Sequence, residues 1–402
     1  MPVSFPHPSG SRGLMPRMTA GALALLTGFL ALSQGYGASG PSPRGIPLGI
    51  FRVQPEVTLS SGYTDNIFKT KTEKENDYLL TIRPVLLAAT NWRQFRFKGG
   101  YSGSYQRHRW NESEDREDHG FDLDLVALPG RNLELNLKSS VDFKHDTRGQ
   151  PDVAQNTPGV PPDAWNHYTV NGGVKFTYNR VRALAELGRS LEDKDSYGSI
   201  TDNAGLKLFL ALAPKTSLTL GGKTSWVRYN DEVNSDKDAN MRGIHVGMEW
   251  DGTAQTSGSA QVGWTFRDMP RMADVDTSTY TWDANVNWRP LRRTQLDLKA
   301  MRGFGEGKEV ASYYTNSLVG LTMTHRVRSF LDLKAGSDYT WNRYNTGKVN
   351  KIWNGSLGID YSLPRYVVLG AEYSLAKNDS NTPGSGYVSN DFMVTAKGTL
   401  GR

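Results

Sequence analysis

The feature that most constrains this chain is a strict alternation of apolar and polar side chains in two adjacent segments, 351–363 and 367–375. Successive side chains of a β-strand point to opposite faces, so a period of two indicates a strand with one apolar and one polar face. The apolar parity holds Trp353, Leu357, Ile359, Tyr361 and Leu363, and then Val367, Leu369, Ala371, Tyr373 and Leu375. Pro364 lies near the break between the segments, where a tight turn tolerates a residue without a backbone N–H. The sequence therefore predicts a β-hairpin over 351–375.

The same alternation of apolar and polar side chains continues from residue 51 to the end of the chain. Counting alternating runs bounded by turn residues gives about eighteen strands. The clearest runs are 121–127, 133–143, 168–178, 206–212, 244–250, 260–266, 280–288, 296–300 and 331–341. The connections alternate in length: tight turns such as 129–131, 179–180 and 214–215 alternate with long polar ones such as 111–118, 148–164, 192–198, 303–310 and 378–386. Short turns at one rim and long loops at the other are typical of an outer-membrane barrel.

The predicted fold class is therefore all-β, a transmembrane antiparallel up-and-down β-barrel of about eighteen strands. The mean hydropathy of −0.53 argues against a bundle of membrane helices, which needs apolar runs of about 18 residues. Trp and Tyr lie near the ends of many predicted strands, where an aromatic belt meets the membrane surface. The alternative is a secreted all-β protein whose polar strand faces lie in bulk water.

The polar parity of the predicted strands carries many charged side chains, which a dry core of this size does not accommodate. We expect these residues to face a watery lumen. They are Arg96, Lys98, Asp122, Asp124, Glu134, Lys138, Asp142, Lys207, Asp283, Asp297, Lys299, Asp332, Lys334, Asp338, Asp360 and Glu372.

The N-terminal 38 residues have the pattern of a secretory signal. Arg12 and Arg17 supply the positive region, 20–32 is apolar, and small residues follow. A membrane anchor is the alternative, although the apolar run is short for a span. We expect 1–38 to be a signal peptide, 39–50 a flexible lead-in and 51–402 an outer-membrane barrel. The chain would then be located in a Gram-negative outer membrane, in contact with its lipid.

Charge and cysteine content exclude several function classes. The formal net charge is +6, and removal of Arg12 and Arg17 with the signal leaves +6 − 2 = +4, which argues against a nucleic-acid partner. The chain contains no cysteine, so it has no disulfide framework, thiolate metal site or cysteine nucleophile.

Catalytic and cofactor-binding motifs are weak. Segment 303–308 fails the Walker spacing and has Glu309 where Ser or Thr is needed. The histidines show no metal-ligand spacing, and the acidic runs 112–118 and 231–238 do not match a known calcium loop, so we expect solvated loop tips there. The pair Asp122 and Asp124 resembles glycosidase carboxylates only in spacing. We expect no enzyme, cofactor or metal; the rival is a hydrolase barrel with a lumen-facing site such as His245 with Glu249.

A family resemblance rests on two further segments. Residues 53–68, which contain a Pro and end in Asp65-Asn66-Ile67-Phe68, resemble the first strand of the putative beta-barrel porin 2 family. Residues 77–92, with Ile82-Arg83-Pro84 and a closing Asn91-Trp92, are similar to its second strand. The resemblance implies a barrel associated with export of exopolysaccharide or capsular polysaccharide. It implies a polysaccharide cargo and periplasmic polysaccharide-export proteins as partners; a general solute porin is the runner-up.

Overall fold

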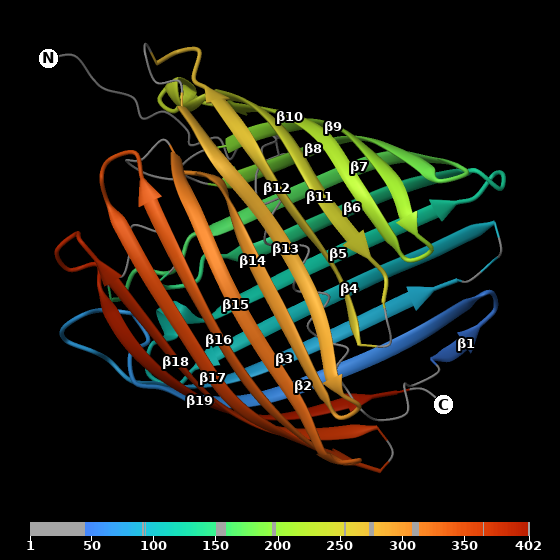
Figure 1. The fold of residues 1–402 in the computed structure, drawn as a ribbon. Helices are drawn as coiled ribbons and strands as arrows, with labels where there is room; N and C mark the ends of the chain where they lie inside the picture. Colours follow the sequence, from blue (N-terminus) through green and yellow to red (C-terminus); the bar gives the residue numbers. More distant parts are fainter. Residues whose placement is uncertain are drawn as a thin grey trace, which may run out of the picture.

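Residues 45–400 are described by the computed structural model, apart from 91, 93, 150–157, 195–197, 253–254, 273–276, 308–312 and 365. Within these residues, eighteen antiparallel strands form one closed barrel (Figure 1). Each strand pairs with its neighbour along the chain, and the last strand pairs with β2 to close the sheet. The predicted all-β up-and-down barrel of about eighteen strands is confirmed.

The strands of the barrel are β2 (Phe51–Thr64), β3 (Asp77–Ala89), β4 (Phe95–His108), β5 (Arg116–Ala127), β6 (Leu133–His145), β7 (Ala164–Tyr178), β8 (Val181–Lys194), β9 (Gly198–Ala213), β10 (Thr216–Tyr229), β11 (Ala239–Trp250), β12 (Thr256–Asp268), β13 (Thr277–Leu291), β14 (Thr294–Glu306), β15 (Tyr313–Arg328), β16 (Leu331–Tyr344), β17 (Val349–Leu363), β18 (Val367–Ser380) and β19 (Tyr387–Thr399). Two 3-10 turns, η1 (Glu112–Glu114) and η2 (Ser235–Lys237), lie in loops at the same end of the barrel.

Several strands extend further into the predicted long loops than their sequence pattern indicated. The connection predicted over 192–198 is wrong in length, because β8 continues to Lys194 and β9 begins at Gly198. Likewise β14 continues to Glu306 and β18 to Ser380. Polar side chains on both faces hide the period of two near Lys194 and Ser380, and Gly303 and Gly305 hide it near Glu306, while the backbone ladder to the neighbouring strand continues.

The chain before the barrel is only partly described. The predicted signal peptide, 1–38, and residues 39–44 lie outside the described residues. The rest of the predicted lead-in contains a short strand, β1 (Ile46–Leu48), which pairs antiparallel with the start of β2. The barrel strands therefore begin and end at the short-turn end, where β2 starts and β19 stops (Figure 1).

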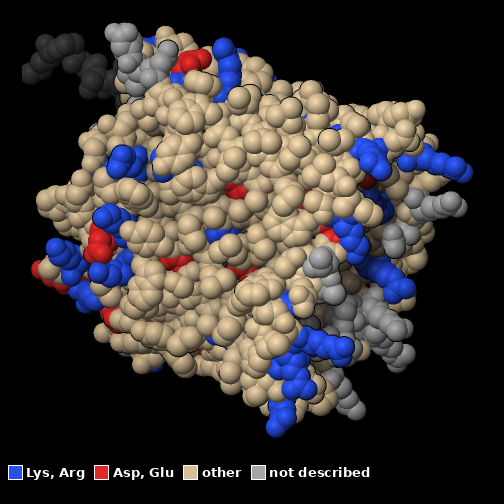
Figure 2. Space-filling model, in the orientation of Figure 1, with Lys and Arg blue, Asp and Glu red and all other residues tan. Residues whose placement is uncertain are grey.

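Strand register fixes which side chains share a face. Leu357 on β17 lies opposite Tyr373 on β18, and both are exposed on the outer face, as the sequence predicts for this hairpin. The outer surface is mostly uncharged in its middle band, with Lys, Arg, Asp and Glu gathered toward the two ends (Figure 2). The conventional core is correspondingly small, with Val227, Ala239 and Met269 forming a buried apolar cluster. Among the described residues, no helix is long and apolar enough to cross a membrane.

Candidate functional site: the lumen and its long-loop mouth

We propose that the sixteen charged residues of the polar parity line the inner face of the barrel, because the register sets several of them opposite one another, as Lys98 with Asp124 and Asp124 with Lys138. On β6, Glu134 and Lys138 alternate with Leu135 and Leu137, whose side chains are exposed on the outside. The same alternation continues strand by strand around the sheet, for example from Asp338 through its register partners on both sides. The inner face therefore combines both signs of charge with amides and hydroxyls.

Many of the inner charges form ion pairs between strands. Glu134 lies 2.7 Å from Lys175 on β7 and 3.9 Å from Arg96 on β4. Lys334 lies 2.5 Å from Asp360. Further pairs between strands are Lys138 with Asp124 at 4.0 Å, Lys207 with Glu249 at 2.6 Å, Arg326 with Asp332 at 3.5 Å and Lys397 with Glu56 at 2.7 Å. Within β6, Lys144 lies 2.6 Å from Asp142. Because opposite charges are adjacent, their fields largely cancel a short distance from the wall.

Not every predicted lumen residue has a charged partner. Glu372 is exposed on the inner face and forms no ion pair with any described residue. Polar neutral groups are joined to the acids in other places: the Asn354 amide donates to Asp338 at 2.8 Å, and the Asn287 amide donates to Asp297 at 2.5 Å. The lining thus consists of short contacts between polar groups, and its charged side chains do not form a long row with a single sign of charge.

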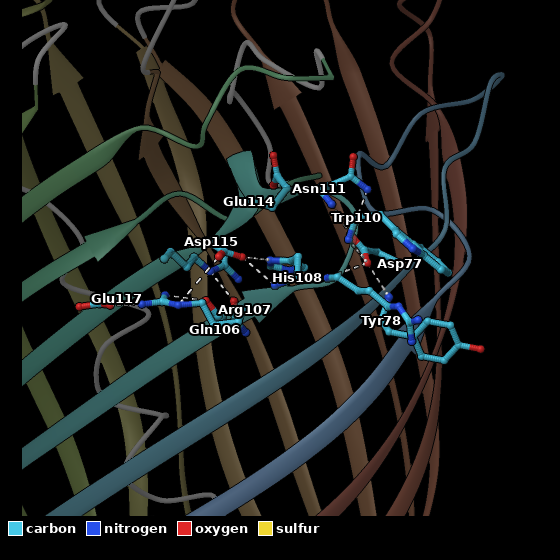
Figure 3. Close-up of polar contacts among 12 residues, drawn as sticks. Asp77, Tyr78, Gln106, Arg107, His108, Trp110, Asn111, Glu114, Asp115 and Glu117 are labelled. Atoms are coloured by element: carbon cyan, nitrogen blue, oxygen red, sulfur yellow. Dashed lines mark hydrogen bonds and ion pairs between the residues drawn. The ribbon is translucent and has the colours of Figure 1, made fainter.

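At the long-loop end, one buried carboxylate holds the β4–β5 loop in place (Figure 3). Asp77, the first residue of β3, is fully buried. Its Oδ1 accepts the backbone N–H groups of Tyr78, Arg109 and Trp110 at 2.7, 3.1 and 3.2 Å, and its Oδ2 accepts the backbone N–H of Asn111 at 3.0 Å. The side-chain amide of Asn111 adds a further bond at 3.0 Å. Hydrogen bonds to an ionised acceptor are the stronger kind, so this residue fixes where the loop leaves the barrel wall.

Residues 146–149, which follow β6, contact other segments of this mouth. Arg148 is buried and donates to both carboxylate oxygens of Glu114, at 3.1 and 2.5 Å, while its guanidinium lies 5.7 Å from the ring centroid of Phe68 in the β2–β3 loop. The next residue, Gly149, accepts a hydrogen bond at 3.2 Å from the hydroxyl of Tyr387 on β19. From β6 to β19 is five strand spacings, roughly 24 Å along the wall at about 4.8 Å each. Residues 146–149 therefore connect distant parts of the rim.

These contacts correct one expectation from the sequence. The acidic run 112–118 was expected to be a solvated loop tip, but Glu114 is 3% exposed and paired with Arg148. From Arg116 onward the run is already strand β5. The reason is that a charge is kept inside when a bidentate guanidinium satisfies it. Nothing in the local sequence marked this pairing, because the two partners lie 34 residues apart.

A second buried ion pair lies under the loops on the other side of the mouth. Arg267 on β12 is fully buried and makes two hydrogen bonds with the carboxylate of Glu306, at 2.6 and 2.8 Å. Its guanidinium also lies 5.1 Å from the ring centroid of Tyr313, which packs on the apolar cluster of Val227, Ala239 and Met269. The ends of β12, β14 and β15 are thus tied together above the membrane-spanning part.

The alternative chemistries considered for the sequence find little geometric support. His245 and Glu249 share the inner face but lie four residues apart on β11, which separates them by about 13 Å along a strand. The Glu249 carboxylate accepts a hydrogen bond from Lys207 instead. Segment 303–306 is strand, and Lys308 lies outside the described residues. Among the residues described, no three His, Cys, Asp or Glu side chains form a group suited to a metal ion.

A closed barrel with an apolar outer band, a charged inner face and alternating short turns and long loops defines the class of outer-membrane β-barrels. The model of the putative beta-barrel porin 2 family matches residues 40–399, so the chain belongs to this family. The resemblance drawn from 53–68 and 77–92 is confirmed. The protein is therefore a porin-like protein of the outer membrane.

Solved structures overlap with this barrel at low sequence identity. The ferric enterobactin receptor PfeA of Pseudomonas aeruginosa has a TM-score of 0.46 and 9% identity, covering 87% of this chain and 80% of that one. OpdK of Pseudomonas aeruginosa, solved with vanillate, has a TM-score of 0.48 and 10% identity, covering 87% of this chain and 99% of that one. The siderophore receptor PirA of Pseudomonas aeruginosa has a TM-score of 0.41 and 11% identity, covering 87% of this chain and 80% of that one. No curated protein sequence matches the chain.

Proposed function

We propose that this barrel conducts a long polysaccharide across the outer membrane to the cell surface. The observation that carries the proposal is the lining of the lumen, in which short polar contacts and neutralised ion pairs are dispersed over the whole wall. A moving polymer needs many weak contacts, because a few strong ones would hold it. Hydroxyls and amides such as Ser140, Thr169 and Asn354 offer such contacts to sugar hydroxyls.

The number of strands in the barrel is large enough for an aqueous channel through which a polymer can pass. Barrels of about 16–18 strands enclose an aqueous channel, whereas about eight strands leave room only for side chains or one small ligand. Conduction also requires that binding be weak enough for the cargo to leave. Glu372, exposed on the wall beside the pair of Lys334 and Asp360, is the kind of group a passing chain contacts transiently.

The family association with polysaccharide-export loci supports the choice of cargo. It also supports periplasmic polysaccharide-export proteins as partners that deliver the polymer. In outer-membrane barrels the short turns face the periplasm, so a delivering partner would approach the end where β2 begins and β19 stops. No catalytic role is included in the proposal; of the two residues weighed for a hydrolase site, Glu249 accepts a hydrogen bond from Lys207.

The test uses purified protein in liposomes loaded with a linear, fluorescent polysaccharide sorted by chain length. We expect release of long chains through the barrel, at a rate that falls gradually with length. Empty liposomes, and liposomes with an eight-stranded barrel, serve as controls. Release of small sugars with retention of every long chain would favour the runner-up, a general solute porin.

A further inference from the structure

The short turns of the barrel carry basic side chains and almost no acidic ones. Among the described turn residues, the acid is Asp251. The exposed cations of the turns and of the two strand ends beside them are Arg131, Arg180, Lys215, Arg289, Arg292, Arg293 and Arg328. We call these seven residues the basic rim. Their turns belong to five different hairpins, from β5–β6 to β15–β16, so the positive charge is spread around the pore mouth.

The charge of the basic rim is not neutralised by neighbours. None of the seven side chains forms an ion pair with a described acidic residue. The acidic side chains at the adjoining strand ends form ion pairs with other bases. Glu134 pairs with Lys175 and Arg96, Glu249 pairs with Lys207, and Asp332 pairs with Arg326. On the face drawn in Figure 2, Lys and Arg side chains gather at the right and lower right, toward the short-turn end, with few Asp or Glu among them.

The opposite end of the barrel has a different balance of charge. In the long loops, acids are paired with bases: Glu114 with Arg148, Asp115 with Arg107, and Asp238 with Arg271. The long-loop end thus has both signs of charge side by side, unlike the basic rim. Between the two ends, the paired charges of the wall add little of either sign. The unpaired cations of the basic rim draw an anion into the mouth, and the neutralised wall does not hold it inside.

A lipid headgroup is the other candidate for these cations, and the positions beside them argue against it. The outward-facing residues at the short-turn ends of the strands are apolar or aromatic, among them Tyr178, Trp288 and Tyr361, all exposed on the outer face. The lipid-facing belt at this end is thus aromatic, as is usual at a membrane surface. Five of the basic side chains lie on the turns themselves, and Arg289 and Arg328 lie at the strand ends beside them.

We infer that the basic rim is an electrostatic entrance for a polyanion, so that the polymer passing this barrel is an acidic polysaccharide bearing carboxylate or phosphate groups. This inference rests on the proposed function and specifies its substrate. Clustered charge at a channel mouth raises association rates by about 10- to 1,000-fold, and salt screens the effect because the Debye length is about 10 Å at 0.1 M and about 3 Å at 1 M.

The experiment measures blockade of single channels in a planar bilayer by two polymers of equal length, anionic polygalacturonate and neutral dextran. The chain has no cysteine, so Thr346→Cys in the exposed β16–β17 loop, blocked from one side by an impermeant thiol reagent, establishes which end faces which chamber. With polymer on the short-turn side in 0.1 M salt, we expect polygalacturonate to block at least about tenfold more often than dextran. In 1 M salt the difference should largely vanish.

The variant Arg289→Gln/Arg292→Gln/Arg293→Gln/Arg328→Gln should reduce polygalacturonate events toward the dextran frequency. The matched control, Lys71→Gln/Lys74→Gln, removes exposed cations of the long-loop end and should leave the frequency unchanged. Equal blockade by both polymers would overturn the electrostatic entrance while leaving polymer export in place. Loss of preference for anionic lipid in the variant, without a change in blockade, would assign the rim to lipid. Absence of blockade by either polymer, with small sugars still permeant, would overturn the proposed function itself.

Discussion

The hydroxyl of Tyr387, on β19, donates a hydrogen bond of 3.2 Å to the carbonyl oxygen of Gly149, in the loop that follows β6. The two residues are 238 positions apart and belong to strands on separate parts of the rim. Gly149 has φ +79°, and a Cβ there would lie 2.6 Å from the Tyr387 hydroxyl, so both the backbone and the contact require glycine. The position of residues 148–149 thus depends on local backbone geometry as well as on the buried pair of Arg148 and Glu114.

Release of this loop should widen the mouth. Glu114→Ala leaves the buried Arg148 without its charged partner, a loss of about 3–5 kcal/mol for a buried pair. We expect higher single-channel conductance with more frequent flickering, while the barrel keeps its heat-modifiable gel mobility. Tyr387→Phe removes one hydrogen bond, worth about 0.5–1.5 kcal/mol, and should give a smaller effect in the same direction. Unchanged conductance in both variants would show that the loop does not limit the pore.

The depth of an outward residue should decide the cost of placing a charge there. Leu357 lies near the middle of β17 and is 64% exposed on the outer face, so Leu357→Arg should destabilise the barrel by about 2–4 kcal/mol. Leu369 lies near the short-turn end of β18, where Leu369→Arg should cost about 0–1 kcal/mol. The neighbour Ser356 faces inward, and Ser356→Arg is the matched control that should fold normally. Urea unfolding in liposomes measures all three; a costly Ser356→Arg with a tolerated Leu357→Arg would mean that the register is reversed.

Two lumen carboxylates should differ in their influence on ion selectivity. Glu134 neutralises Lys175 and Arg96, so Glu134→Ala leaves two cations without a partner. Glu372 has no charged partner among the described residues, so Glu372→Ala removes one negative charge only. We expect both variants to fold, and both to shift the reversal potential in a salt gradient toward anions, with the larger shift for Glu134→Ala. Equal reversal potentials in both variants and the native protein would contradict their placement in the conducting path.

The pair of Arg267 and Glu306 should stabilise the long-loop end. Glu306→Ala leaves a fully buried guanidinium without a carboxylate and should lower the free energy of unfolding by about 3–5 kcal/mol. Arg267→Met/Glu306→Leu replaces both charges with apolar groups of similar size and should recover most of the loss, because a buried pair often contributes little net stability. Thermal unfolding in detergent provides the measurement. A double variant as unstable as Glu306→Ala would mean that the interaction has a role other than neutralising a buried charge.

The sequence predicted the parts of this structure that repeat. The hairpin over 351–375 follows from a period of two, because a barrel wall has one apolar and one wet face. The mouth could not be predicted in this way. Contacts such as Glu114 with Arg148 join loops 34 residues apart and leave no periodic signal. The strand ends near Lys194 and Glu306 were missed because polar side chains on both faces near Lys194, and glycines at 303 and 305 near Glu306, hide the period of two.

The measurement that tests the central claim most directly is deletion of the gene, followed by assay of surface polysaccharide and of small-solute uptake in the same cells. The account predicts loss of polymer from the surface, its accumulation in the periplasm, and unchanged uptake. Expression of the native chain should restore export. Normal surface polymer with slowed solute uptake would contradict the account and identify the barrel as a general solute porin.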